Sequence, residues 1–235
     1  MLGPYKLNTI VTGDARELAK AIPEESVDLV LTDPPFGIGF KYSHDFKDIP
    51  EREYPDFLRW VIRESERVAK PGAPIFIFQA MGMLKKTWPL FPDDSRIFAN
   101  CKNFVQMNRG DIPHAFDPVI FWQKPGGKLW AKNGRDWFLA NTANTNNRGL
   151  SEAGFHSCPR PLDSIIYMIE TFSPPAGLVI DWFMGSGTTA LASKILGRNY
   201  WGCEIDPETA ALARKRVEMT QPPLFVMQPT QDSLL

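Results

Sequence analysis

Short runs of consecutive apolar residues alternate along the chain with longer segments whose apolar residues recur at helical spacing. A continuous apolar run such as Val27 to Thr32 is typical of a strand that is buried on both faces of a sheet. Segment 54–69 instead has helical apolar spacing, and the following Lys70-Pro71-Gly72 ends it. This alternation predicts an α/β fold, with a mostly parallel sheet of about seven strands and helices on both faces.

The predicted elements show no internal repeat. Strands are expected at 9–12, 27–32, 74–78, 104–107, 119–122, 178–182 and 200–204. Helices are expected at 14–22, 54–69, 162–172, 188–196 and 207–219. The length fits one α/β domain over residues 1–220, with a short insertion at 124–155 where Gly, Lys, Asn and Arg follow no clear period. Residues 221–235, which lack Lys and Arg, are expected to form a loose C-terminal tail.

Composition and charge exclude several classes of protein. The 26 Lys and Arg against 27 Asp and Glu give a net charge of −1, so the chain is not a polycation that coats nucleic acid. Three cysteines without a CxxC pair favour a reducing compartment and argue against a zinc ribbon. The three histidines show no ligand spacing, so no metal is expected. No apolar run approaches the roughly 20 residues of a membrane span, and we expect a cytoplasmic protein.

The first candidate site is the turn Asp33-Pro34-Pro35-Phe36 at the end of the buried run 27–32. Ligands of open α/β sheets bind outside the carboxyl ends of the strands, where this turn lies. The prolines fix the backbone and lack N–H donors, which leaves carbonyl groups to accept hydrogen bonds. The Asp33 carboxylate and the Pro34 carbonyl therefore suit an exocyclic amine, with Phe36 stacking on its ring. An acidic turn with an aromatic plug is the purely structural alternative.

The second candidate site follows the strand expected at 178–182 and reads Asp181-Trp182-Phe183-Met184-Gly185-Ser186-Gly187-Thr188-Thr189. Its glycines allow close backbone approach, and the start of the next helix favours an anionic group such as a carboxylate. The turn lacks the lysine of a P-loop and the glycine spacing of a dinucleotide fingerprint. Glu204 ends the next strand, where a carboxylate commonly binds a ribose diol; a solvated strand end is the alternative.

Together the two turns resemble motifs IV and I of the DNA methyltransferases that methylate exocyclic amino groups with S-adenosylmethionine. Their order, with the Asp33 turn first, resembles the permuted β group of that family. Residues 10–14 and 67–72 also resemble segments of the family, and residues 156–161 resemble the family's HPxxKP segment. Arg160 stands where the family usually has Lys, and Phe36 stands where Tyr is commoner. The resemblance implies a Rossmann-like methyltransferase fold with circularly permuted motif order.

The resemblance also assigns residues to roles. The catalytic residues would be Asp33, Pro34, Pro35 and Phe36. S-adenosylmethionine, which leaves as S-adenosylhomocysteine, would be bound by Asp14, Asp33, Arg160, Pro161, Asp181, Phe183, Gly185, Ser186, Gly187, Thr188, Thr189 and Glu204. The target base would flip out of the duplex, its amine held by Asp33 and Pro34, and accept the methyl group directly without a metal or covalent intermediate.

The resemblance favours adenine N6 as the target, because members that methylate cytosine N4 usually carry Ser at the position of Asp33. Cytosine C5 methylation needs a nucleophilic cysteine, typically in a Pro-Cys pair that this chain lacks. A zinc deaminase is excluded because no HxE with PCxxC is present. Three alternatives stay open: a cytosine-N4 enzyme, an RNA adenine methyltransferase, and a catalytically silent DNA-binding subunit.

Double-stranded DNA is the expected partner, and residues 96–135 carry seven Lys and Arg against two Asp. The insertion 124–155 is interpreted as a short target-recognition region. The candidate DNA-binding residues are Lys124, Lys128, Lys132, Arg135, Asn144, Asn146, Asn147 and Arg148. The resemblance also suggests a restriction-modification context in a bacterium or phage-infected cell, and it leaves open a homodimer and a cognate restriction enzyme.

Overall fold

The computed structural model describes residues 1–39, 48–102, 114–140 and 160–220. Within these ranges one sheet of eight strands runs in the order β1-β8-β7-β2-β3-β5-β4-β6. The strands are β1 (Thr9–Thr12), β2 (Leu29–Thr32), β3 (Pro74–Phe78), β4 (Arg96–Lys102), β5 (Phe116–Gln123), β6 (Trp137–Ala140), β7 (Leu178–Asp181) and β8 (Asn199–Glu204). The pairings are parallel except those of β5, which runs antiparallel to β3 and β4. The predicted mostly parallel α/β fold is therefore confirmed.

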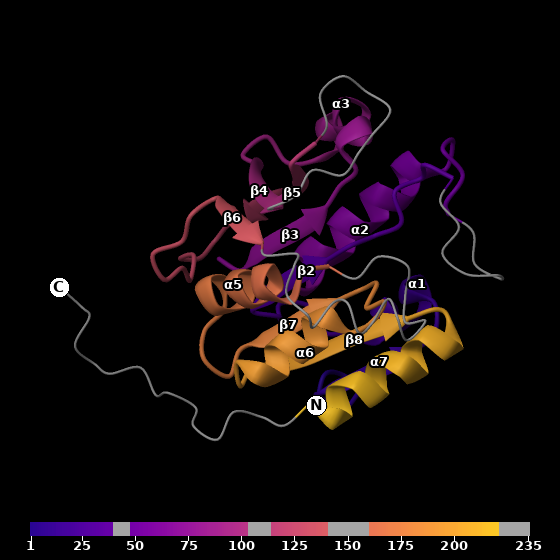
Figure 1. Cartoon of the computed structure of the whole chain (residues 1–235), viewed down its shortest axis with the longest axis vertical. Coiled ribbons are helices and arrows are strands. Elements are labelled where there is room, and N and C mark those ends of the chain that lie inside the picture. The colour runs from indigo at the N-terminus through magenta and orange to yellow at the C-terminus, as the bar shows by residue number, and fades with distance from the viewer. Residues whose placement is uncertain (40–47, 103–113, 141–159, 221–235) are drawn as a thin grey trace.

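Helices cover both faces of the sheet (Figure 1). The α-helices are α1 (Ala15–Leu18), α2 (Tyr54–Val68), α3 (Leu84–Thr87), α5 (Leu162–Phe172), α6 (Thr188–Ile195) and α7 (Pro207–Met219). Short 3-10 turns occupy η1 (Ala19–Ala21), η2 (Met81–Met83) and η3 (Trp88–Leu90). The helix expected at 14–22 is thus divided into α1 and η1, while the other predicted helices end within one residue of the observed ones. None of the helices in the described part of the chain has the length and apolarity that crossing a bilayer requires.

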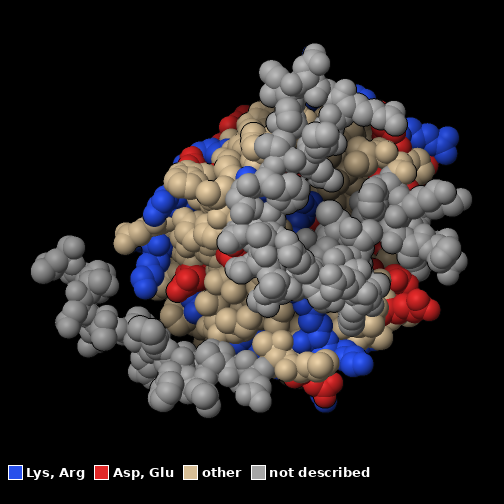
Figure 2. Space-filling model, viewed as in Figure 1, with Lys and Arg blue, Asp and Glu red and all other residues tan. Residues whose placement is uncertain are grey.

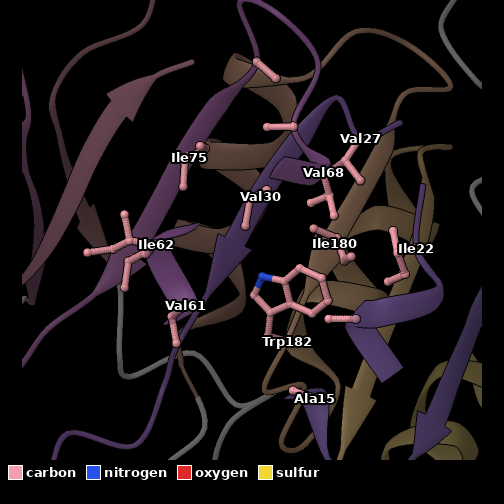
Figure 3. Close-up of a cluster of buried hydrophobic side chains, with 14 of the residues drawn as sticks. Ala15, Ile22, Val27, Val30, Val61, Ile62, Val68, Ile75, Ile180 and Trp182 are labelled. Carbon is pink, nitrogen blue, oxygen red and sulfur yellow. The ribbon is translucent and has the colours of Figure 1, made fainter. Parts of the chain in front are cut away.

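The central strands are buried on both sides because their side chains alternate between two apolar clusters. Val30 of β2 and Ile75 of β3 pack on the side of α2, together with Ile180 and Trp182 (Figure 3). Phe76 of β3 packs on the opposite side, under α5. This burial on both faces explains why the sequences of these strands are continuous apolar runs.

One polar residue in the apolar stripe of α2 has a specific partner. Ser65 is fully buried, and its hydroxyl accepts a hydrogen bond of 3.1 Å from the indole N–H of Trp182. Because a buried indole N–H without a partner would be destabilising, this bond lets Trp182 occupy the core beneath the second candidate turn.

The sequence prediction differs from the structure at the far end of the sheet. The strand expected at 104–107 lies outside the described residues, and β4 precedes it. The insertion expected at 124–155 contributes β6, which pairs in parallel with β4 as the last strand. It is an edge strand in which Trp137 and Leu139 are exposed, so its residues do not show the pattern of a buried strand. The expected tail 221–235 also lies outside the described residues.

Candidate active site at the carboxyl edge of the sheet

A cavity of about 540 Å³ opens at the carboxyl ends of the parallel strands, a volume within the usual range for small-ligand sites. The residues that line it follow β1, β2, β3, β7 and β8, together with the start of β5 and the end of β4. Both candidate turns face it, since Phe36 and Gly185 are among its lining residues. Two turns about 150 positions apart in sequence therefore meet because β2 and β7 are neighbours in the sheet.

Most of the predicted site residues line this cavity. They are Asp14, Asp33, Pro34, Pro35, Phe36, Arg160, Asp181, Phe183, Gly185, Ser186, Thr188, Thr189 and Glu204. Pro161 and Gly187 do not line it: Pro161 caps the start of α5 and Gly187 that of α6. Their backbones position the lining residues next to them.

Asp181 connects the Asp33 turn with the glycine turn through buried hydrogen bonds. Its carboxylate accepts hydrogen bonds from the hydroxyls of Thr32 at 2.9 Å and Thr189 at 2.7 Å, and from the backbone N–H of Phe183 at 3.1 Å. Burial nevertheless raises the pKa of Asp181 to about 6, because the hydrogen bonds only partly compensate for the loss of water. Asp181 thus ties the end of β2 to the glycine turn and to the first turn of α6.

The glycine turn has a left-handed backbone at two of its glycines. Gly185 has φ of 51° and Gly187 has φ of 82°, values that favour glycine. The N–H of Gly185 donates to one carboxylate oxygen of Glu204 at 2.8 Å, and the N–H of Asp206 donates to the other at 3.0 Å. Glu204 is therefore held at the cavity wall, where a carboxylate can accept hydrogen bonds from a ribose diol.

Asp14 occupies the cavity wall after β1. Its carboxylate accepts the backbone N–H of Arg16 at 2.8 Å, which caps α1, and forms an ion pair with the Arg16 side chain. These hydrogen bonds hold the pKa of Asp14 below its ordinary value although burial raises it. Asp14 therefore stays ionised and able to accept a hydrogen bond from an amino group.

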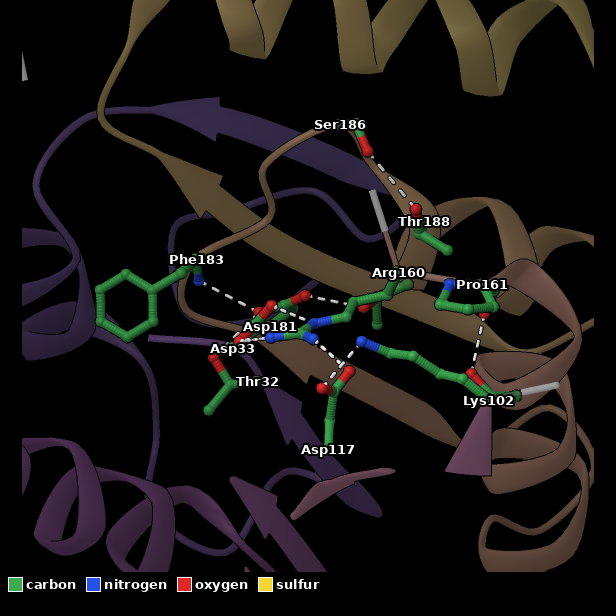
Figure 4. A network of polar contacts seen from close by, with 12 residues as sticks. Thr32, Asp33, Lys102, Asp117, Arg160, Pro161, Asp181, Phe183, Ser186 and Thr188 are labelled. Atoms are coloured by element: carbon green, nitrogen blue, oxygen red, sulfur yellow. Dashed lines mark hydrogen bonds and ion pairs between the residues drawn. The ribbon is translucent and has the colours of Figure 1, made fainter. Parts of the chain in front are cut away.

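Asp33 is paired with Arg160 (Figure 4). The Nε of Arg160 donates to Oδ2 of Asp33 at 2.7 Å, and Nη2 donates to Oδ1 at 2.9 Å. A third guanidinium nitrogen, Nη1, donates to Asp117 at 2.7 Å. Arg160 therefore lines the cavity through contacts with Asp33 and Asp117, and its expected role in cofactor binding stays a prediction.

Aromatic rings flank the same corner. The guanidinium carbon of Arg160 lies 4.6 Å from the ring centroid of Phe78 and 5.9 Å from that of Phe36. Both rings line the cavity, so a flat group could lie against them. Next to Phe36, the Asp48 carboxylate accepts the backbone N–H groups of Gly37, Ile38 and Gly39, which fixes the exit of the turn.

Sequence reasoning missed several cavity residues. Asp117 and Lys102 enter the sequence analysis only through the charge count of residues 96–135, and no role is predicted there for Gln79 or Phe78. Gln79 is 2% exposed and accepts the hydroxyl hydrogen bond of Tyr54 at 3.1 Å. These residues lie beside Asp33 only through strand pairing, which the sequence does not display. The one available signal is that Gln79 directly follows the strand expected at 74–78.

The predicted DNA-binding residues are not gathered at the cavity. Lys124 donates its backbone N–H to Ala73, just before β3, and Lys132 donates to Thr171 at the last turn of α5. Both contacts lie at the amino edge of the sheet, opposite Asp33, and the loop between β5 and β6 also carries Lys128 and Arg135. Asn144, Asn146, Asn147 and Arg148 lie outside the described residues. A DNA-contacting role for either group stays a prediction.

The remaining chemistry in the described residues is limited. No three His, Cys, Asp or Glu side chains of the described ranges cluster as a metal site would require. Burial and neighbouring carboxylates raise the pKa of the Cys203 thiol well above its ordinary value. Cys203 therefore stays protonated and is a poor nucleophile.

Several known proteins that are similar to this chain are DNA methyltransferases. The model of a DNA methylase family, N6_N4_Mtase, matches residues 132–215, which include the glycine turn and Glu204. The type II methyltransferase M.BglII of Bacillus subtilis is 27% identical over 88% of this chain and 68% of its own length. DNA adenine methyltransferase YhdJ of Escherichia coli (strain K12) is 25% identical over 90% of this chain and 83% of its own.

Solved structures share the fold. The PvuII DNA methyltransferase, described as cytosine-N4-specific, has a TM-score of 0.73 and 19% identity over 96% of this chain and 93% of its own. A putative DNA modification methylase from Thermus thermophilus, complexed with S-adenosyl-L-methionine, has a TM-score of 0.64 and 23% identity over 89% of this chain and 92% of its own. The chain therefore has the Rossmann-like fold of these DNA methyltransferases, and its residues 132–215, which include the glycine turn, are similar to the N6_N4_Mtase family of DNA methylases.

Proposed function

We propose that this protein transfers a methyl group from S-adenosylmethionine to the N6 amino group of an adenine flipped out of double-stranded DNA. The observation that carries the proposal is the shared cavity, in which the amine-binding corner at Asp33 and the glycine turn at Gly185 face the same space. A methyl donor held by one turn would then stand beside an amine held by the other, which is the arrangement that direct transfer needs.

The cavity residues fit S-adenosylmethionine. Glu204 is fixed as a hydrogen-bond acceptor for a ribose, and Asp14 is an ionised acceptor for an adenine amino group. The left-handed Gly185 allows a ligand to approach the backbone closely. The start of α6 favours the carboxylate of the amino-acid part. When bound, S-adenosylmethionine supplies an electrophilic methyl group. The Thermus neighbour complexed with that molecule supports the assignment.

At the amine-binding corner, the protein's own groups orient the target. The Asp33 carboxylate and the Pro34 carbonyl accept the two amine N–H groups, which turns the nitrogen lone pair toward the donor side of the cavity. The flat base lies against Phe36 and Phe78. With S-adenosylmethionine bound, the amine nitrogen would gain the methyl group as the carbon–sulfur bond breaks, and it would then release one proton to water. Flipping the base costs a few kcal/mol of stacking and pairing.

Adenine is proposed over cytosine because Asp stands at position 33, where cytosine-N4 members usually carry Ser. The name of the YhdJ relative is consistent with adenine. The PvuII enzyme, at 19% identity, shares the fold and does not bear on the choice of base. The experiment must therefore distinguish methylation of adenine N6 from methylation of cytosine N4.

The test is expression in a host that lacks DNA methylation, followed by hydrolysis of its DNA and mass spectrometry of the nucleosides. N6-methyladenine is expected, and N4-methylcytosine in its place would refute the choice of base. The control is Asp33→Ala, which should lower turnover about a thousandfold, roughly 4 kcal/mol, because the amine loses its acceptor. Binding of S-adenosylmethionine to that variant should survive in calorimetry. Near-normal methylation by Asp33→Ala would contradict the role of Asp33.

A further inference from the structure

Four charged side chains of alternating sign line the cavity beside Phe36. Lys102 donates to Oδ1 of Asp117 at 2.9 Å, Arg160 donates to Oδ2 of Asp117 at 2.7 Å, and Arg160 also holds both oxygens of Asp33 (Figure 4). Their side chains are only 17% to 29% exposed, so each charge depends on its neighbours for compensation. Arg160 is therefore shared between two carboxylates, of which only Asp33 belongs to the amine-binding turn.

The Arg160 guanidinium lies where the target amine is expected. It is planar, it offers N–H donors to the Asp33 carboxylate, and it lies against the rings of Phe78 and Phe36. These are the contacts proposed above for a flipped base and its amino group. A base that enters the corner therefore competes with Arg160 for the Asp33 oxygens and for the faces of the rings.

Asp117 supplies a second place for the charge of Arg160. Separating a partly buried guanidinium from all its counter-ions would be costly, but Arg160 keeps the Asp117 contact if it leaves Asp33. Lys102 binds the other oxygen of Asp117, so the carboxylate stays oriented toward Arg160. The antiparallel pairing of β4 with β5 places these residues, because Cys101 pairs with Phe116 next to them.

We propose that Arg160 occupies the place of the target amine in the free enzyme and passes to Asp117 when the base arrives. Asp117 is then a positioning residue that acts on methyl transfer through Arg160, and Lys102 keeps Asp117 in place. This inference rests on the proposed function, since it assumes that Asp33 receives an amine.

The test measures single-turnover methylation with enzyme in excess over DNA from a methylation-free host, together with S-adenosylmethionine affinity by calorimetry. Asp117→Asn should lower the rate at least tenfold and leave the affinity within twofold, because a neutral amide cannot receive the charge of Arg160. Asp117→Glu should restore most of the rate. Asp56→Asn is the matched control, since it removes the same charge from an exposed ion pair with Arg59 and should have no effect.

If Asp117 acts through Arg160, Asp117→Asn should have no effect once Arg160 is absent, so Asp117→Asn is also made in an Arg160→Gln background. There Asp117→Asn should alter the rate less than twofold. An equal loss in both backgrounds, or no loss in the wild-type background, would overturn the inference. If Asp117→Asn does not fold, Lys102→Gln replaces it, with a loss of about fivefold that must also vanish in the Arg160→Gln background. A wild-type enzyme that transfers no methyl group would instead refute the proposed function.

Discussion

Asp181 illustrates how much a single buried residue contributes to this site. It is only 3% exposed, yet its two oxygens hold the end of β2, the glycine turn and the start of α6 together. The family resemblance predicts that Asp181 binds the cofactor. The structure adds that Asp181 connects the two halves of the cavity, so its protonation affects the stability of the fold.

We predict a pH dependence of stability that is specific to Asp181. Its pKa in the folded protein, about 6, lies above the unfolded value of about 3.9, so the folded state binds the proton more tightly. The stabilisation that comes from proton binding to Asp181 is complete below the unfolded pKa and is lost as the pH rises through the folded pKa. Between pH 4 and pH 7, the unfolding free energy of wild type should fall by about 2 kcal/mol relative to Asp181→Asn.

Urea unfolding of both proteins at each pH measures this difference, and the variant cancels the titration of all other groups. Parallel pH profiles would show that Asp181 titrates alike in the folded and unfolded states. That outcome would mean that its three hydrogen bonds compensate fully for burial.

At the scale of elements, strands and helices were predictable wherever burial leaves a long, regular pattern. The strand 74–78 and the helix 162–172 were predicted with their observed bounds. The two site turns were predictable because Pro and Gly mark strand ends locally. Strand β6 was not, because it is a short edge strand with two exposed residues, Trp137 and Leu139. Neither was the Arg160–Asp117 pair, because it depends on the register of β5.

The glycine turn gives a prediction at this scale. Gly185→Val places a β-branched side chain in the left-handed conformation, where φ is 51°, and should disturb the N–H that holds Glu204. We expect the affinity for S-adenosylmethionine to fall at least tenfold in calorimetry. Gly82→Val is the control, because no other heavy atom lies within 4 Å of a Cβ placed at Gly82 and the φ of Gly82 is not in the left-handed region. Unchanged affinity in Gly185→Val would count against the cofactor assignment.

At the scale of the whole molecule, charges of both signs share the face that Figure 2 shows. Figure 2 shows blue and red side chains interspersed over the described surface in that view, in keeping with the net charge of −1. The basic loop between β5 and β6 lies beyond the amino ends of the strands, and the five residues of β3 alone separate the two edges by about 17 Å. Charge counting along the sequence could not reveal this, because it does not distinguish the two edges of a sheet.

The double variant Lys128→Ala, Lys132→Ala tests where DNA lies. If DNA binds only at the cavity edge, the KM for DNA should change less than twofold, and its salt dependence should be that of wild type. A several-fold rise in KM with a shallower salt dependence would instead show that DNA reaches the amino edge and contacts these two lysines, which the sequence analysis names as candidate DNA-binding residues. Steady-state methylation at two or more salt concentrations separates these outcomes.

The sheet order also dictates when this site can form during synthesis on a ribosome. Strand β2 has β3 on one side and β7 on the other, and β7 starts about 150 positions after β2. A nascent chain that ends before Leu178 therefore exposes one edge of β2, an apolar strand that could pair with another chain. Efficient production of this protein should consequently depend on shielding that edge until the last quarter of the chain emerges.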